Sequence, residues 1–115
     1  MLKPKREQIF ISYAREDVAD KEKLASELLA KLDVTKFLIW DDSQMQAGTY
    51  ETKIQNQIKK SSTYLLLISK DFLKSRFIKK ELKWIYHELN RNKSKIIIPV
   101  MLKDCLLYTS DAADE

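Results

Sequence analysis

The stretch IFISY, residues 9–13, followed directly by ARED, residues 14–17, decides the fold of this chain. An apolar run of this length predicts a buried strand, and the small and charged residues after it predict a turn into a helix. In an open parallel α/β sheet, ligands bind beyond the carboxyl ends of the strands, at the point where the strand order reverses. The turn at 14–17 is therefore the first place to look for chemistry.

The same alternation of apolar strand and amphipathic helix continues along the chain. After the first strand, at 8–13, further strands are predicted at 37–40, 64–68 and 95–102. Apolar residues recur at helical spacing between the strands, which predicts three helices. The residues that mark these helices are Val18, Leu24, Ala25, Leu28, Leu29 and Leu32, then Ile54 and Ile58, then Ile78, Leu82, Ile85 and Leu89.

This pattern predicts the α/β class, as a flavodoxin-like three-layer sandwich in which helices cover both faces of a parallel sheet. The flavodoxin-like order, one of two common solutions for such sheets, places the strands as second, first, third and fourth. Its switch point lies between the first and third strands. The turn at 14–17 and the loop at 69–81 are therefore expected to form the walls of a cleft.

The composition fits one small domain. The chain has 115 residues, of which 44% are apolar and 33% charged, and no apolar run approaches the roughly 18 residues that a membrane helix needs. A single cysteine and a single histidine leave no internal disulfide and no His/Cys metal site, and the expected location is the cytoplasm. The net charge is +4, but the lysines are interspersed with acidic residues, so neither nucleic acid nor a membrane is an expected partner.

One glycine, Gly48, is too few for the glycine-rich motifs that bind nucleotides. The dinucleotide fingerprint and the phosphate-binding P-loop both need more than one glycine at fixed spacing, so a Rossmann dehydrogenase and a P-loop NTPase are excluded. A phosphorylation receiver shares the strand order but needs an acidic cluster after the first strand and an aspartate closing the third. Ser12, Tyr13 and Ala14 stand at the first place and Ser69 at the second, which excludes that class as well.

The last residues of the chain, CLLYTSDAADE at 105–115, differ from the Lys-, Ile- and Leu-rich sequence before them. They contain no lysine or arginine and continue no helix or strand pattern. They resemble one reading frame of a transposase adapter used in sequencing libraries. We therefore expect 105–115 to be a non-native tail.

Four motifs in the remaining sequence are similar, in identity and in order, to those of one known family. They are FISYAREDV at 10–18, IWDDSQMQAG at 39–48, LLLIS at 65–69 and SRFIKKEL at 75–82. Together they resemble the Toll/interleukin-receptor (TIR) domain family, in particular its prokaryotic members. The resemblance implies a domain truncated at its C-terminus, because a fifth strand and a last helix usually follow the strand at 95–102. The expected organisation is an N-terminal extension at 1–7, an incomplete TIR domain at 8–104 and the tail at 105–115.

In enzymatic TIR domains the glutamate of the fourth motif is essential for cleaving NAD+, and it corresponds to Glu81. Cleavage of the nicotinamide–ribose bond creates an oxocarbenium-like centre, which one carboxylate stabilises or traps. Phe77, where many members have tryptophan, lies one helical turn before Glu81. The resemblance implies NAD+ as a substrate with no cofactor and no metal, and the other expected substrate contacts are Tyr13, Ala14, Arg15 and Ser69. Without the resemblance, Glu81 reads as a solvated helix residue among neighbouring lysines.

The second motif resembles the BB loop, through which TIR domains contact one another. Gly48 would supply a positive φ angle in this loop, and Ala47 stands where many members have proline. The residues expected in this self-association loop are Asp41, Asp42, Gln46, Ala47 and Gly48. Two functions follow from the resemblance: a self-associated NAD+ glycohydrolase or cyclase in prokaryotic immunity or signalling, and a non-catalytic module for homotypic TIR–TIR association.

Overall fold

A computed structural model of the chain describes residues 6–42 and 50–102. Its elements are β1 (Glu7–Ser12), η1 (Arg15–Asp17), α1 (Val18–Lys31), β2 (Phe37–Trp40), α2 (Tyr50–Lys60), β3 (Thr63–Ile68), α3 (Lys70–Lys74), α4 (Arg76–Arg91) and β4 (Ile96–Met101). Gln46, Ala47 and Gly48 of the expected self-association loop, and the tail at 105–115, lie outside the described residues. No helix of the described ranges is both long and apolar enough to cross a membrane.

The strands form one sheet in the order β2-β1-β3-β4, and every neighbouring pair is parallel. This confirms the fold class and the strand order that the sequence predicts. The central strands β1 and β3 are buried almost throughout, which explains their near-continuous apolar sequences. The carboxyl ends of β1 and β3 lie side by side, because Ser12 pairs with Leu66.

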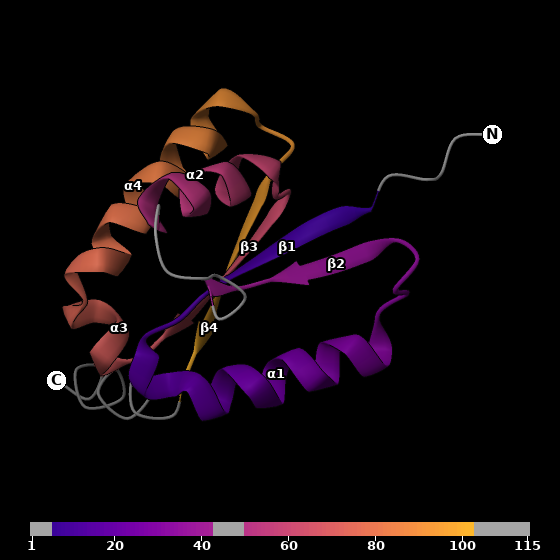
Figure 1. Ribbon diagram of the computed structural model, residues 1–115, viewed down its shortest axis with the longest axis horizontal. Coiled ribbons are helices and arrows are strands. Elements are labelled where there is room, and N and C mark those ends of the chain that lie inside the picture. Colours follow the sequence, from indigo (N-terminus) through magenta and orange to yellow (C-terminus); the bar gives the residue numbers. More distant parts are fainter. Residues whose placement is uncertain (1–5, 43–49, 103–115) are drawn as a thin grey trace, which may run out of the picture.

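Helices cover both faces of the sheet, so the molecule has three layers (Figure 1). Successive residues of a strand point to opposite faces, and this alternation divides the core in two. Phe10 and Tyr64 pack on the side of α2 and α4, together with Ile54, Ile58, Phe72, Ile78 and Ile85. Ile9, Ile11, Leu65 and Leu67 pack on the other side, against α1.

The described structure departs from the predicted helices in two places. The stretch at 69–81, expected to be a loop, contains the short helix α3 and the beginning of α4. Two serines explain this: Ser69 accepts a hydrogen bond from Phe72 N (3.0 Å) and Ser75 accepts one from Ile78 N (3.2 Å), so each caps the helix that follows it. Val18 and Leu29, counted in the apolar stripe of α1, are 45% and 54% exposed, because α1 turns only part of its surface toward the sheet.

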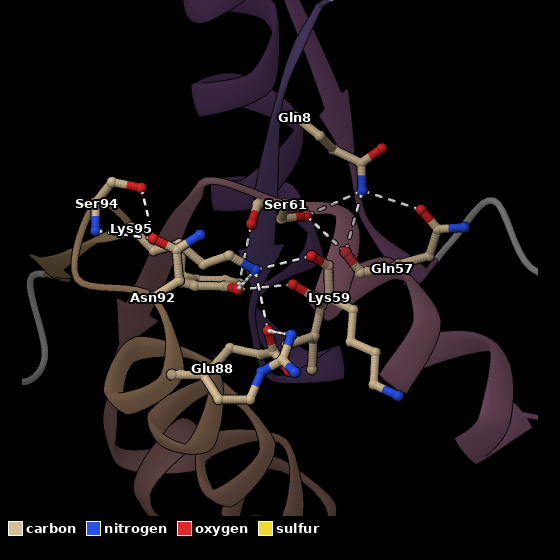
Figure 2. A network of polar contacts seen from close by, with 11 residues as sticks. Gln8, Gln57, Lys59, Ser61, Glu88, Asn92, Ser94 and Lys95 are labelled. Carbon is tan, nitrogen blue, oxygen red and sulfur yellow. Dashed lines mark hydrogen bonds and ion pairs between the residues drawn. The ribbon is translucent and has the colours of Figure 1, made fainter.

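A polar network ties the helices to the amino-terminal end of the sheet, as Figure 2 shows. Gln8 Nε2 donates hydrogen bonds to Gln57 Oε1 and Ser61 Oγ, both at 2.9 Å. Lys95 Nζ lies 3.2 Å from Glu88 Oε1 and donates to the carbonyl oxygen of Lys59 (2.8 Å). Polar side chains at this end are therefore satisfied by one another.

Candidate active site

An open pocket of about 770 Å³ lies at the opposite, carboxyl-terminal end of the sheet. This is the position that the strand order predicts, next to the switch point between β1 and β3. Its walls come from the turn after β1, the start of α1, the second residue after β2, helix α3 and the first turns of α4. The lining residues are Tyr13, Ala14, Arg15, Glu16, Val18, Asp42, Asp71, Lys74, Ser75, Phe77, Ile78 and Glu81.

Glu81 lies in the pocket wall and not among the lysines on the outer face of α4. Its residue is only 4% exposed, and its Oε1 accepts a hydrogen bond of 2.9 Å from Ser12 Oγ at the end of β1. Ile78, Glu81, Ile85 and Glu88 form the buried stripe of α4, at the i, i+3, i+4 spacing of one helix face. The reading of Glu81 as a solvated surface residue is therefore wrong, and the apolar periodicity around it already contained this information.

The pKa of Glu81 is raised from 4.5 to about 8. Burial is the main cause, because desolvation disfavours the charged carboxylate. The negative charge of Asp42 raises the pKa further, while the hydrogen bond from Ser12 opposes the shift. The free protein therefore holds Glu81 largely protonated at neutral pH.

Asp42 and Tyr13 form a second polar pair at the pocket. Both residues line it, and the Tyr13 hydroxyl is hydrogen-bonded to Asp42. Burial and the negative charge of Asp42 raise the pKa of the Tyr13 phenol well above its ordinary value, so Tyr13 is the donor in this pair. The sequence places Asp42 in the self-association loop; the structure adds that its side chain reaches the pocket that holds Glu81.

Asp41, the preceding residue, is buried and forms an ion pair with Lys21, a lysine that the charge pattern of the sequence predicts to be solvated. Its residue is 5% exposed, and its Oδ2 lies 3.4 Å from Nζ of Lys21, which is 2% exposed. The Lys21 ammonium also lies 5.2 Å from the centre of the Tyr13 ring. A lysine flanked by Asp20 and Glu22 gives no sequence signal of burial, so only the tertiary structure reveals Lys21.

The other predicted contacts divide into those at the pocket and one beside it. Ala14, Arg15 and Phe77 line the pocket together with Tyr13 and Glu81, and the Phe77 ring meets Trp84 edge-on at 6.3 Å between centroids. Ser69 does not line the pocket. It is 1% exposed, caps α3 and donates a hydrogen bond to Asp17, so it holds α3 against the turn after β1.

Charges of both signs surround the entrance of the pocket. Arg15 comes from η1 and Lys74 from the end of α3, and both side chains belong to exposed residues. Together they offer two cationic groups to an anionic part of a ligand. Within residues 6–42 and 50–102, no cluster of three His, Cys, Asp or Glu side chains is arranged to hold a metal ion.

Comparison with known proteins identifies the fold and the family of this chain. The crystal structure of the TIR domain of the Toll-related receptor TRR-2 from Hydra magnipapillata matches with a TM-score of 0.60 and 23% sequence identity, covering 84% of this chain and 71% of that one. At this identity the match shows the fold alone. A search of curated proteins found no match. The family model for the TIR domain matches residues 9–114, nearly the whole chain, and this chain therefore belongs to the TIR domain family.

Proposed function

We propose that this TIR domain cleaves NAD+ at the bond between nicotinamide and ribose, with Glu81 as the catalytic residue. The observation that carries the proposal is the position of Glu81: a buried carboxyl group, 4% exposed, in the wall of a pocket large enough for a nucleotide. A carboxyl group in such an environment, with a strongly shifted pKa, is a candidate for chemistry. The proposed setting is the cytoplasm of a prokaryote, in immunity or signalling.

The proposed reaction needs one carboxylate and no metal. The C1′–N bond of NAD+ breaks, and its electron pair goes to nicotinamide, which leaves as a neutral molecule. The ionised Glu81 stabilises the positive charge that develops on the ribose. Water then adds to C1′ and loses a proton, which gives ADP-ribose; attack by a nitrogen of the adenine would give a cyclic product instead.

The surrounding residues suit the parts of this substrate. The Phe77 ring, fixed by Trp84, offers an apolar wall one helical turn from Glu81. Arg15 and Lys74 offer their charges to the two phosphates. NAD+ also brings a cationic ring next to Glu81, which favours the ionised carboxylate. The nicotinamide riboside and the phosphates of the ligand thus have chemically matched partners at the pocket.

The test is nicotinamide release from NAD+ by the full chain, measured by chromatography at high protein concentration. The variant Glu81→Gln should lower the rate at least about a hundredfold, because it keeps the shape and removes the charge. Glu88→Gln is the matched control, since Glu88 is a carboxyl group equally buried in α4 but at the opposite end of the sheet. Circular dichroism confirms that each variant is folded.

Two outcomes would contradict the proposal. A folded parent chain that releases no nicotinamide, even when self-associated, would favour the second function, a non-catalytic TIR–TIR association module. A Glu81→Gln variant that cleaves NAD+ at the parent rate would remove Glu81 from the reaction.

A further inference from the structure

We propose that Lys21 is a positioning residue of the pocket: its buried ammonium group holds Asp41 and Tyr13 in place, and thereby keeps the Tyr13–Asp42 pair beside Glu81. The consequence for catalysis rests on the proposed function, whereas the consequence for the structure of the pocket does not.

The contacts of Lys21 connect three elements. Lys21 belongs to the first turn of α1, and its side chain is 3% exposed. Its ammonium lies 3.4 Å from Oδ2 of Asp41, the residue directly after β2, and 5.2 Å from the ring of Tyr13, the residue directly after β1. It also lies 3.1 Å from Oε1 of Glu22, a side chain that is 66% exposed. Lys21 therefore joins α1 to the carboxyl ends of both strands.

The connection between Lys21 and Asp41 joins two buried charged groups. A buried ammonium or carboxylate is strongly disfavoured unless it is paired, so Lys21 and Asp41 each stabilise the buried charge of the other. If the ammonium is removed, the buried charge of Asp41 loses this partner, and the segment after β2 gains by turning Asp41 toward water. Asp42 is bonded to Asp41 and moves with it. The pocket then loses the carboxylate that pairs with Tyr13.

The pKa of Glu81, which lies in the same pocket, should respond to this movement of Asp42. The negative charge of Asp42 is one of the causes that raise the pKa of Glu81. Loss of Asp42 from the pocket therefore lowers the pKa of Glu81. Direct loss of a nearby positive charge would have the opposite effect and raise it, so the direction of the shift separates repositioning from simple electrostatics.

Replacement of Lys21 should leave the other groups at the pocket unchanged. Glu81 also receives the hydrogen bond from Ser12, and the remaining ionisable side chains of the lining are Arg15, Glu16 and Asp71, with Lys74. None of these is among the described partners of Lys21. A change in the titration of Glu81 therefore reports on the segment that carries Asp41 and Asp42.

The experiment compares Lys21→Met with Lys23→Met in the full chain. Methionine keeps an unbranched apolar stem and removes the charge, and Lys23 is an exposed lysine of the same helix. The titration of Glu81 is followed by NMR of carboxyl-labelled glutamate, with Glu81→Gln to assign the signal. Lys21→Met should lower the midpoint of Glu81, Lys23→Met should leave it unchanged, and Lys21→Arg should restore it toward the parent value.

A folded Lys21→Met chain in which Glu81 titrates as in the parent, or at higher pH, would overturn the proposal. If Lys21→Met does not fold, Lys21→Gln replaces it, because its amide can still donate a hydrogen bond to Asp41 while the positive charge is gone; a smaller downward shift is expected, and an unchanged or higher midpoint would again overturn the proposal. Nicotinamide release is measured in parallel. A parent chain without NAD+ cleavage contradicts the proposed function, while the NMR titration still decides the role of Lys21.

Discussion

Glu81 is a carboxyl group placed by its helix where a hydrophobic residue would normally stand. It occupies the buried stripe of α4 between Ile78 and Ile85, and Ser12 provides its hydrogen bond (2.9 Å). A buried neutral carboxyl group with one hydrogen-bond partner is tolerated, whereas burial makes its ionisation unfavourable. The raised pKa of about 8 is the direct result, and it makes the chemistry of the pocket sensitive to pH.

The proposed activity should therefore rise with pH. At pH 7 about one tenth of the free protein carries an ionised Glu81 if its pKa is about 8. Because the ionised form is the one that stabilises the ribosyl cation, kcat/KM for nicotinamide release should increase up to a plateau above about pH 8. The measurement is an initial-rate profile from pH 6 to 9.5. A flat profile, or one that falls with pH, would show that the ionised carboxylate is not what the reaction needs.

The raised pKa of Glu81 also affects stability, which should fall with rising pH where the proposed activity rises. The folded state keeps Glu81 protonated between its ordinary value of 4.5 and about 8, whereas the unfolded chain ionises it. The contribution of Glu81 to the free energy of unfolding therefore falls as pH rises through this window and stays low above it. This decline should be absent in Glu81→Gln, which makes the variant the reference for the titration.

At the scale of single elements, β4 is the most exposed strand of the sheet. It pairs only with β3 in the described structure, and Ile96 and Ile98 are 54% and 42% exposed. Ile96 and Ile98 point to the face of the sheet against which α1 packs (Figure 1), and a helix about 10 Å wide does not cover four strands spaced about 4.8 Å apart. Ile97 points to the other face and packs against the core beneath α2 and α4.

Pro99 fits the position of β4 at the edge. Ile96 N and Leu102 N donate to carbonyl oxygens at either end of β3, 2.9 Å away. N–H groups alternate in direction along a strand, so the nitrogen of Pro99, at odd spacing from both, faces away from β3. The missing N–H therefore costs no hydrogen bond with β3.

The exposed face of β4 should promote aggregation, and one charge should suppress it. Ile98→Lys should lower light scattering at high protein concentration and change the free energy of unfolding by about 1 kcal/mol or less, because residue 98 is half exposed. Ile97→Lys is the control: it places the same charge on the covered face and should destabilise the chain by more than about 2 kcal/mol. Urea denaturation measures both. Equal destabilisation by the two variants would contradict this description of β4.

At the scale of the whole molecule, the two ends of the sheet provide different environments for a buried glutamate of α4. At the amino end, Gln8, Glu88 and Lys95 belong to a network of satisfied polar groups (Figure 2). There the hydrogen bond and charge of Lys95 outweigh burial and hold the pKa of Glu88 below its usual range. At the carboxyl end, Glu81 is buried without a described cation and its pKa is raised. Glu81 and Glu88 lie on the same helix, but their pKa values shift in opposite directions because Glu88 has a described cationic partner, Lys95, and Glu81 has none.

The segment QMQAG at 44–48 leads to a prediction for the assembled protein. If a neighbouring domain uses this segment to complete the pocket, the specific rate of nicotinamide release should increase with protein concentration. The rate per chain is measured over a hundredfold range of concentration, with the molecular mass recorded by light scattering at each point. A constant rate per chain across a change from monomer to oligomer would show that one domain is sufficient.

The sequence by itself determined the α/β class, because apolar strands such as 64–68 and helical stripes such as Ile78–Leu89 record local burial directly. The strand order followed from one of the two common solutions for a parallel sheet of this kind. The expected switch point of the sheet brought forward the turn after β1, and the resemblance to TIR domains brought forward Glu81 and Phe77. Helix α3 was missed because five residues are too few for a periodicity to appear.

Only the tertiary structure decided how the charged residues are used. Glu81 could face the lysines or the pocket, and the packing of α4 against β1 turned it inward to Ser12. Lys21 and Asp41 are separated by 20 positions, and neither carries a local sign of burial; their pairing at 3.4 Å exists because the fold brings the first turn of α1 to the end of β2. Hydrophobic periodicity is a local property that a sequence displays, whereas the environment of a charge depends on long-range contacts that form only when the chain folds.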